Sequence, residues 1–162
     1  MSDAEPQPAP FQPMSSQIVY VVYVATTMEK LWEALTSSEV LRKNWGRIES
    51  EWTKGSQIRE IDDSGDILWR GDILRSEPPQ LLSYTFEVTG SGEPPTEVTF
   101  ELSPPVSPIV PGAKIVQLRL TQSGFKESSK VFPGCARAWP EILSSVKTYL
   151  ETSCPLGFAW KH

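Results

Sequence analysis

Residues 132–150 read FPGCARAWPEILSSVKTYL, and this stretch decides the fold. Its apolar residues recur at steps of three and four, which is typical of one face of a long amphipathic helix. Pro140 interrupts the pattern, and because proline removes one backbone hydrogen bond and clashes with the preceding turn, we expect a kink or a restart there. A helix of this length needs a broad apolar surface against which to bury its stripe.

The middle of the chain supplies that surface as strands. Alternation of apolar and polar residues predicts strands at residues 47–53, 56–62, 67–75, 80–89, 95–103 and 113–122. Turn residues such as Lys54-Gly55 and Asp63-Ser64-Gly65 separate them, so the strands should form antiparallel hairpins. A strongly curved sheet of this kind has a concave face, and the long helix would cover it.

The segment before these strands begins with a further strand. Residues 18–25 read IVYVVYVA, which is almost wholly apolar and favours a strand covered on both faces. Two short helices should follow. The first is capped by Thr26 or Thr27, and the second spans residues 38–43, capped by Thr36 or Ser37. The sequence therefore predicts an α+β domain with about seven strands.

Chain length and composition set the domain limits. The 162 residues fit one compact domain, which we expect over residues 18–152. Residues 1–17 carry four prolines among polar residues and are expected to be a disordered arm. Residues 153–162 form a C-terminal tail.

Charge and targeting signals narrow the partners. The chain has 15 Lys and Arg against 20 Asp and Glu, a net charge of −5, which disfavours nucleic acid and anionic membrane surfaces. It has no apolar run of membrane-spanning length and no signal-peptide pattern, so we expect no membrane insertion and a cytoplasmic location. Cys135 and Cys154 are not spaced as a redox or metal motif and are interpreted as free thiols.

The sequence gives little support for a catalytic or cofactor site. The only histidine is His162, so the candidate nucleophiles Ser64, Ser123 and Cys135 lack the usual general base. The acidic residues of 60–66 lack metal-loop spacing and are interpreted as a solvated turn. No glycine-rich phosphate loop occurs. We therefore expect no catalytic residue, no metal and no cofactor.

Aromatic residues converge on one predicted interior. Alternation places strand side chains on the face that meets the long helix, and the two short helices would border the mouth of a cavity there. Its predicted lining is Trp32, Trp45, Trp69, Tyr84, Phe86, Phe100, Leu118, Trp139 and Leu143. The alternative is that these side chains simply fill the core. Tyr84 is the best candidate for a polar anchor, the alternative being a core tyrosine bonded to backbone.

Charged residues within the strands are assigned to the opposite face. Alternation puts Arg70 and Asp72 opposite Trp69, and Glu60 is grouped with them in surface ladders of opposite charge. Arg119 lies opposite Leu118 and would enter the pocket only if a bulge shifted the register.

Several motifs together resemble a known family. They are Leu31-Trp32-Glu33-Ala34-Leu35-Thr36, Gly71-Asp72-Ile73-Leu74 followed by Glu77-Pro78-Pro79-Gln80-Leu81-Leu82, Thr96-Glu97-Val98-Thr99-Phe100-Glu101-Leu102, and Trp139 four residues before Leu143. In order and spacing the chain resembles the Bet v 1-like (START-related) superfamily, in the branch named for the activator of Hsp90 ATPase homologue 1. The resemblance implies a helix-grip fold, in which the curved sheet wraps around the long C-terminal helix and leaves an internal cavity.

Three functions follow as hypotheses. The first is a non-enzymatic module that binds an apolar or aromatic small molecule in the cavity. The second, suggested by the name of the branch, is a protein-interaction domain for a chaperone or another partner, in which the tail residues Leu156, Phe158 and Trp160 could pair with a second copy. The third is a polyketide cyclase or dehydratase that depends on Tyr84 or Arg119.

Overall fold

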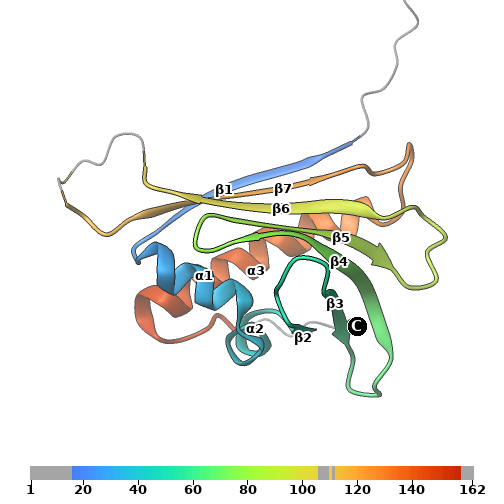
Figure 1. The fold of residues 1–162 in the computed structure, drawn as a ribbon, viewed down its shortest axis with the longest axis horizontal. Coiled ribbons are helices and arrows are strands. Elements are labelled where there is room, and N and C mark those ends of the chain that lie inside the picture. Colours follow the sequence, from blue (N-terminus) through green and yellow to red (C-terminus); the bar gives the residue numbers. More distant parts are fainter. Residues whose placement is uncertain (1–15, 106–109, 111, 158–162) are drawn as a thin grey trace, which may run out of the picture.

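The computed structural model describes residues 16–105, 110 and 112–157, so residues 1–15 of the predicted arm (1–17) and Phe158 and Trp160 of the tail lie outside the described residues. Seven antiparallel strands form one curved sheet in the order β1-β7-β6-β5-β4-β3-β2. The three helices of the described residues lie on its concave side (Figure 1). The elements are β1 Ile18–Val24, α1 Met28–Thr36, α2 Ser38–Asn44, β2 Arg47–Ser50, β3 Gln57–Ile61, β4 Ile67–Glu77, β5 Leu81–Val88, β6 Thr96–Ser103, β7 Val116–Ser123 and α3 Phe132–Thr152. The predicted helix-grip arrangement is confirmed.

Helix α3 is the element around which the sheet curves. It runs as one helix from Phe132 to Thr152 and does not restart at Pro140. Its buried face includes Trp139, Ile142, Leu143 and Val146, on both sides of the position where the restart was expected. Burying that continuous stripe outweighs the single backbone hydrogen bond that the proline removes.

The start of α3 is fixed by the connection between β5 and β6. The carboxylate of Glu93 accepts the backbone N–H groups of Lys130 at 2.9 Å and Val131 at 3.3 Å, and the Ser129 hydroxyl donates to it. Ser129 Oγ in turn accepts the N–H of Phe132 at 3.1 Å. These side chains satisfy N–H groups that a helix start leaves without partners, and they tie α3 to the sheet.

Both short helices begin at hydroxyl caps. Thr27 Oγ1 accepts the N–H of Lys30 at 3.2 Å at the start of α1, and Ser37 Oγ accepts the N–H of Val40 at 3.4 Å at the start of α2. Of the predicted alternatives, Thr27 and Ser37 are therefore the caps. Helix α2 ends at Asn44, and Trp45 follows as its C-cap.

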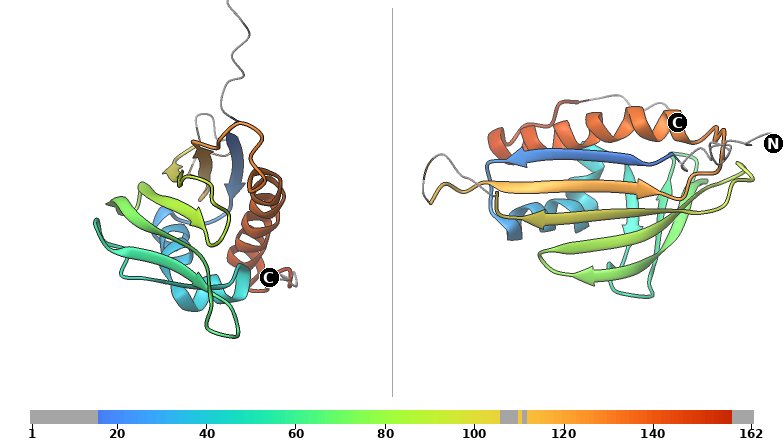
Figure 2. Two further views of the ribbon diagram at one scale, coloured as in Figure 1. Left: turned by 90° about the vertical axis from the view of Figure 1, so that its right-hand side faces the viewer. Right: turned by 90° about the horizontal axis from the view of Figure 1, so that it is seen from above.

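Strand β1 differs from its prediction. It lies at one edge of the sheet, beside β7 and α3 (Figure 2), and exposed side chains alternate with buried or half-buried ones. Val19, Val21 and Tyr23 are 45%, 40% and 51% exposed, so the expectation of a strand covered on both faces is wrong. Continuous apolar runs are typical of doubly covered strands, but an antiparallel sheet can leave one face without a covering layer.

Most predicted strands are confirmed with small shifts at their ends. Strand β2 is three residues shorter than predicted and stops at Ser50 instead of residue 53. Trp52 has φ +59°, a left-handed conformation that ends the extended backbone. Strand β7 begins at Val116, three residues after its predicted start.

Candidate functional site

Five aromatic side chains form a closed circuit between the sheet and α3. Successive ring centroids lie 5.5 Å apart for Trp45–Trp69, 5.8 Å for Trp69–Tyr84, 6.2 Å for Tyr84–Phe100, 5.7 Å for Phe100–Trp139 and 5.1 Å for Trp139–Trp45. We call this set the aromatic circuit. These separations are within the range of favourable ring pairs.

Each member comes from a different element. Trp69, Tyr84 and Phe100 point inward from the adjacent strands β4, β5 and β6, as the alternation predicts, and Trp139 points inward from α3. All four are less than 5% exposed. Trp45, at the end of α2, closes the circuit and is only half-buried. The circuit thus has four fixed walls and one member at the surface.

Buried polar groups hold two of the indoles in place. Trp69 Nε1 donates to Glu60 Oε1 at 2.8 Å, and Trp139 Nε1 donates to Gln122 Oε1 at 2.7 Å. Gln122 Nε2 donates in turn to Thr96 Oγ1 at 2.9 Å. Since each indole has one donor and that donor is used, both ring planes are fixed.

The position of Glu60 corrects the sequence analysis. Grouping it with surface ladders was wrong, because its side chain is 2% exposed and faces the interior. The signal was present in the sequence, since Glu60 is two residues from Ile58 and shares its face of β3. The charged strand residues that do face outward are Arg70, Asp72 and Arg119, as predicted.

Tyr84 brings a buried hydroxyl group into the circuit. It is 1% exposed, and its hydroxyl has no hydrogen-bond partner among the described residues. Burial raises the pKa of Tyr84 well above its usual value, and the nearby Cys135 and Glu60 raise it further. The group is therefore a neutral O–H, and leaving it without a partner costs about 1–3 kcal/mol.

Side chains nearly fill a space that borders four members of the circuit, Trp45, Tyr84, Phe100 and Trp139. The free volume is about 10 Å³, which is room for at most one water molecule. Its lining consists of Leu35, Leu41, Trp45, Trp52, Tyr84, Phe100, Trp139, Ile142, Leu143 and Val146. We call this space the inner pocket. A larger molecule can enter only if one of these side chains moves.

The structure places the nine predicted lining residues in three groups. Trp45, Tyr84, Phe100, Trp139 and Leu143 line the inner pocket. Trp69 stacks on Trp45 and Tyr84, Phe86 packs on Trp69 with ring centroids 4.6 Å apart, and Leu118 is buried on β7. Trp32 packs half-buried on α1 and is not among the lining residues.

Trp52 was missed by the sequence analysis. It lines the inner pocket from the connection between β2 and β3. Its inward position depends on its left-handed backbone, for which a tryptophan gives no sequence signal.

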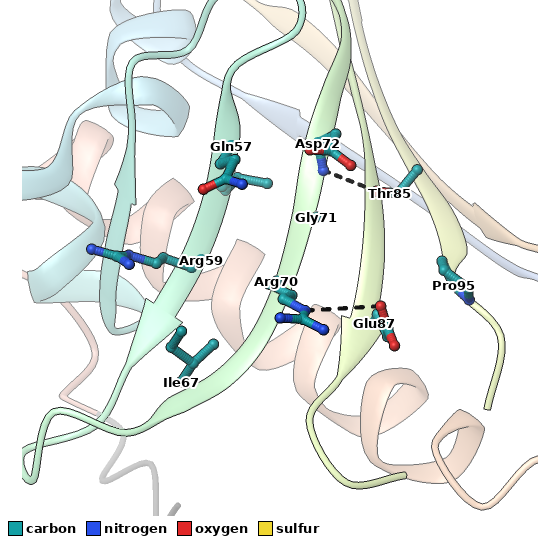
Figure 3. Close-up of a pocket in the computed structure, with 10 residues that line it drawn as sticks. Gln57, Arg59, Ile67, Arg70, Gly71, Asp72, Thr85, Glu87 and Pro95 are labelled. Atoms are coloured by element: carbon teal, nitrogen blue, oxygen red, sulfur yellow. Dashed lines mark hydrogen bonds and ion pairs between the residues drawn. The ribbon is translucent and has the colours of Figure 1, made fainter. Parts of the chain in front are cut away.

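Among the described residues, two further hollows lie on the outside. One is a groove of about 420 Å³ lined by Arg42, Trp45, Gly46, Arg47, Ile61, Asp62, Asp63 and Ser64, which we call the outer groove. The other, of about 260 Å³, lies on the outer face of β3, β4 and β5, where Arg70 pairs with Glu87 at 4.0 Å (Figure 3). Exposed charges of both signs line this second hollow, and such pairs contribute little energy.

The remaining chemistry is modest. Cys135 and Cys154 are free, as expected, and burial raises the pKa of Cys135 to about 11, so its thiol stays protonated near neutral pH. Among the described residues, no group of three His, Cys, Asp or Glu could hold a metal ion. No helix in the described ranges could cross a membrane.

Comparison with known proteins identifies the family. Residues 25–151 match the model of the family described as Activator of Hsp90 ATPase homolog 1-like protein. The chain belongs to this family. No curated protein sequence matches this family member.

Solved structures share its fold. A protein from Mesorhizobium loti superimposes with a TM-score of 0.72 at 24% identity, over 84% of this chain and 97% of the other. The Aha1 dimer from Colwellia psychrerythraea has a TM-score of 0.68 at 22% identity, over 85% and 97%. An Hsp90 activator from Plasmodium falciparum has a TM-score of 0.67 at 17% identity, over 83% and 96%. At these identities the likeness concerns the fold.

Proposed function

We propose that this family member binds an apolar aromatic molecule in the inner pocket, with the Tyr84 hydroxyl as its polar anchor. The observation that carries the proposal is this buried hydroxyl, which has no partner among the described residues and lies within the aromatic circuit. A ligand atom that hydrogen-bonds to it would remove the cost of leaving it unpaired. The surrounding rings offer stacking and edge contacts to a flat molecule.

Tyr84→Phe separates this role from a purely structural one. Phenylalanine keeps the ring and removes only the unpaired hydroxyl, so we expect the unliganded protein to gain about 1–3 kcal/mol in free energy of unfolding. We expect the same variant to bind 2-naphthol two- to tenfold more weakly, since one hydrogen bond of about 0.5–1.5 kcal/mol is lost. Urea unfolding and isothermal titration calorimetry measure the two effects.

Naphthalene is the matched probe, because it has the same ring system without the hydroxyl. Wild type and Tyr84→Phe should bind it equally. Equal 2-naphthol affinity of the two proteins, or a loss of stability in Tyr84→Phe, would contradict the anchor role.

The cyclase hypothesis loses one of its two candidate residues. Arg119 points away from the inner pocket, has a half-exposed side chain and lies 4.0 Å from Glu101. We therefore favour binding of an aromatic molecule over a cyclase reaction.

We propose self-association through β1 as a second function. Val19, Val21 and Tyr23 form an exposed apolar row along the edge strand, and the structural neighbours include an Aha1 dimer. Beside this row, Arg119 and Glu101 lie on the same outer face, so two copies related by a two-fold axis could exchange this ion pair.

Sedimentation velocity tests this second function. Wild type should sediment as a dimer at micromolar concentration, and Val21→Lys should sediment as a monomer because the new cation lies in the row and beside Arg119. Gln57→Lys places the same side chain at an exposed position of β3 and should leave the dimer intact. A monomeric wild type at all concentrations would refute the proposal.

A further inference from the structure

Trp45 has a special place in the aromatic circuit. Its ring stacks on Trp69 with an interplanar angle of 16° and meets Trp139 edge-on at 64°. The four other members are held by strands or by the middle of α3, whereas Trp45 follows the last residue of the seven-residue helix α2. Its indole thus occupies a slot whose walls are built by other elements.

Trp45 also separates two spaces. Among the described residues, it is the one side chain that lines both the inner pocket and the outer groove. The inner pocket has a free volume of about 10 Å³, and the outer groove about 420 Å³. Rotation of the Trp45 side chain toward the groove would therefore open the inner pocket to solvent without moving a strand.

The outer groove can receive an aromatic ring. Arg42 and Arg47 line it, and guanidinium groups pack favourably on the face of an indole. In the opposite direction, the walls that Trp45 leaves are the stacked ring of Trp69 and the steeply inclined ring of Trp139, which are fixed by their bonds to Glu60 and Gln122. The vacated slot would keep the shape of two fused rings.

We infer that Trp45 is an internal stand-in for the ligand, and that the ligand is a flat bicyclic aromatic molecule with one hydrogen-bonding group that displaces it. The ring system replaces the indole between Trp69 and Trp139, and the polar group reaches the Tyr84 hydroxyl. This inference rests on the proposed function and specifies its ligand class. It also makes Trp45 the side chain that opens and closes the pocket.

The stand-in lowers the apparent affinity of the wild type, because the ligand must first displace Trp45. Only the fraction of molecules with an open slot binds directly, and the apparent dissociation constant rises in proportion. Trp45→Ala removes the competitor, so we expect it to bind 2-naphthol about tenfold more tightly than wild type, as the loss of two ring pairs would allow.

The test must separate the native slot from an artificial hole. Adding Tyr84→Phe to Trp45→Ala should weaken 2-naphthol binding two- to tenfold and leave naphthalene binding unchanged. Trp32→Ala is the matched control, because Trp32 is half-buried like Trp45 but lies on α1, outside the circuit. The Trp32→Ala protein should bind 2-naphthol with the same affinity as wild type.

Fluorine NMR of the wild type gives a measurement that does not depend on the folding of Trp45→Ala. The chain has 6 Trp, and 5-fluorotryptophan labelling with Trp45→Phe assigns the signal of Trp45. Addition of 2-naphthol should increase the solvent isotope shift of Trp45 and leave that of Trp139 low.

The outcomes separate the stand-in role of Trp45 from the proposed binding function. If wild type binds 2-naphthol with dependence on Tyr84, but Trp45→Ala binds no more tightly and the Trp45 signal gains no solvent exposure, the stand-in role is wrong and the binding function stands. If neither protein binds with dependence on Tyr84, both are wrong.

Discussion

At the scale of single residues, the site depends on how closely Gly46 approaches Glu60. A Cβ atom on Gly46 would lie 2.7 Å from Glu60 Oε2, and the other oxygen of that carboxylate holds the Trp69 indole. The backbone that carries Trp45 is therefore packed directly on the group that orients its stacking partner. A methyl group here would disturb both tryptophans.

Gly46→Ala tests this contact. The added methyl group must displace a buried carboxylate from its indole partner, so we expect a loss of about 1–3 kcal/mol in free energy of unfolding and altered tryptophan fluorescence. Gly134→Ala is the matched control, because a Cβ atom at that helical position meets nothing within 4 Å. It should stabilise the protein by about 0.5–1 kcal/mol. Equal effects of the two substitutions in urea unfolding would show that Gly46 is not tightly packed.

At the scale of elements, the start of α3 depends on the ionised form of Glu93. The hydrogen bonds from Ser129, Lys130 and Val131 lower the pKa of Glu93, the bond from Ser129 most strongly. A folded-state pKa below the unfolded value means that the stabilisation is present above the ordinary glutamate value of about 4.3 and is lost as the pH falls through the folded-state pKa. The Ala25 N–H and Lys147 lower the pKa of Glu151 in the same direction at the other end of α3.

We therefore expect the free energy of unfolding to fall as the pH is lowered from 5 to 3. Glu93→Gln should be less stable than wild type at pH 7 and should lose less stability over this interval, because one titrating cap is gone. Glu127→Gln removes the same charge from an exposed position near α3 and should retain the pH dependence of wild type. Parallel curves for wild type and Glu93→Gln would exclude Glu93 as a contributor.

Element periodicity explains which predictions from the sequence succeed. Helical spacing in α3 and alternation in β4, β5 and β6 correctly predict which faces of Trp139, Trp69, Tyr84 and Phe100 turn inward. These features are local, so the sequence carries them. The exposure of β1 depends on which strands lie beside it and on whether a layer covers its outer face, which no described residue does for Val19, Val21 and Tyr23. An apolar run by itself does not report either.

At the scale of the whole molecule, the sequence predicts a cavity and the structure holds a nearly closed aromatic circuit. The closure follows from tertiary positions that periodicity cannot specify: the end of α2 brings Trp45 onto Trp69, and the left-handed Trp52 turns toward the same space. The polar partners Glu60 and Gln122 likewise depend on pairing across the interior. Residue types on a face are predictable, but the volume left between them is a small difference between large packed volumes.

The central claim is that the aromatic circuit opens to bind a flat aromatic molecule at Tyr84. Intermolecular nuclear Overhauser effects between 2-naphthol and ¹³C-labelled wild-type protein test it most directly. We expect contacts from the ligand ring protons to Trp69, Tyr84 and Trp139, with Trp45 moved toward Arg42 and Arg47. Contacts confined to the outer face of the sheet, or none to these three residues at saturating ligand, would contradict it.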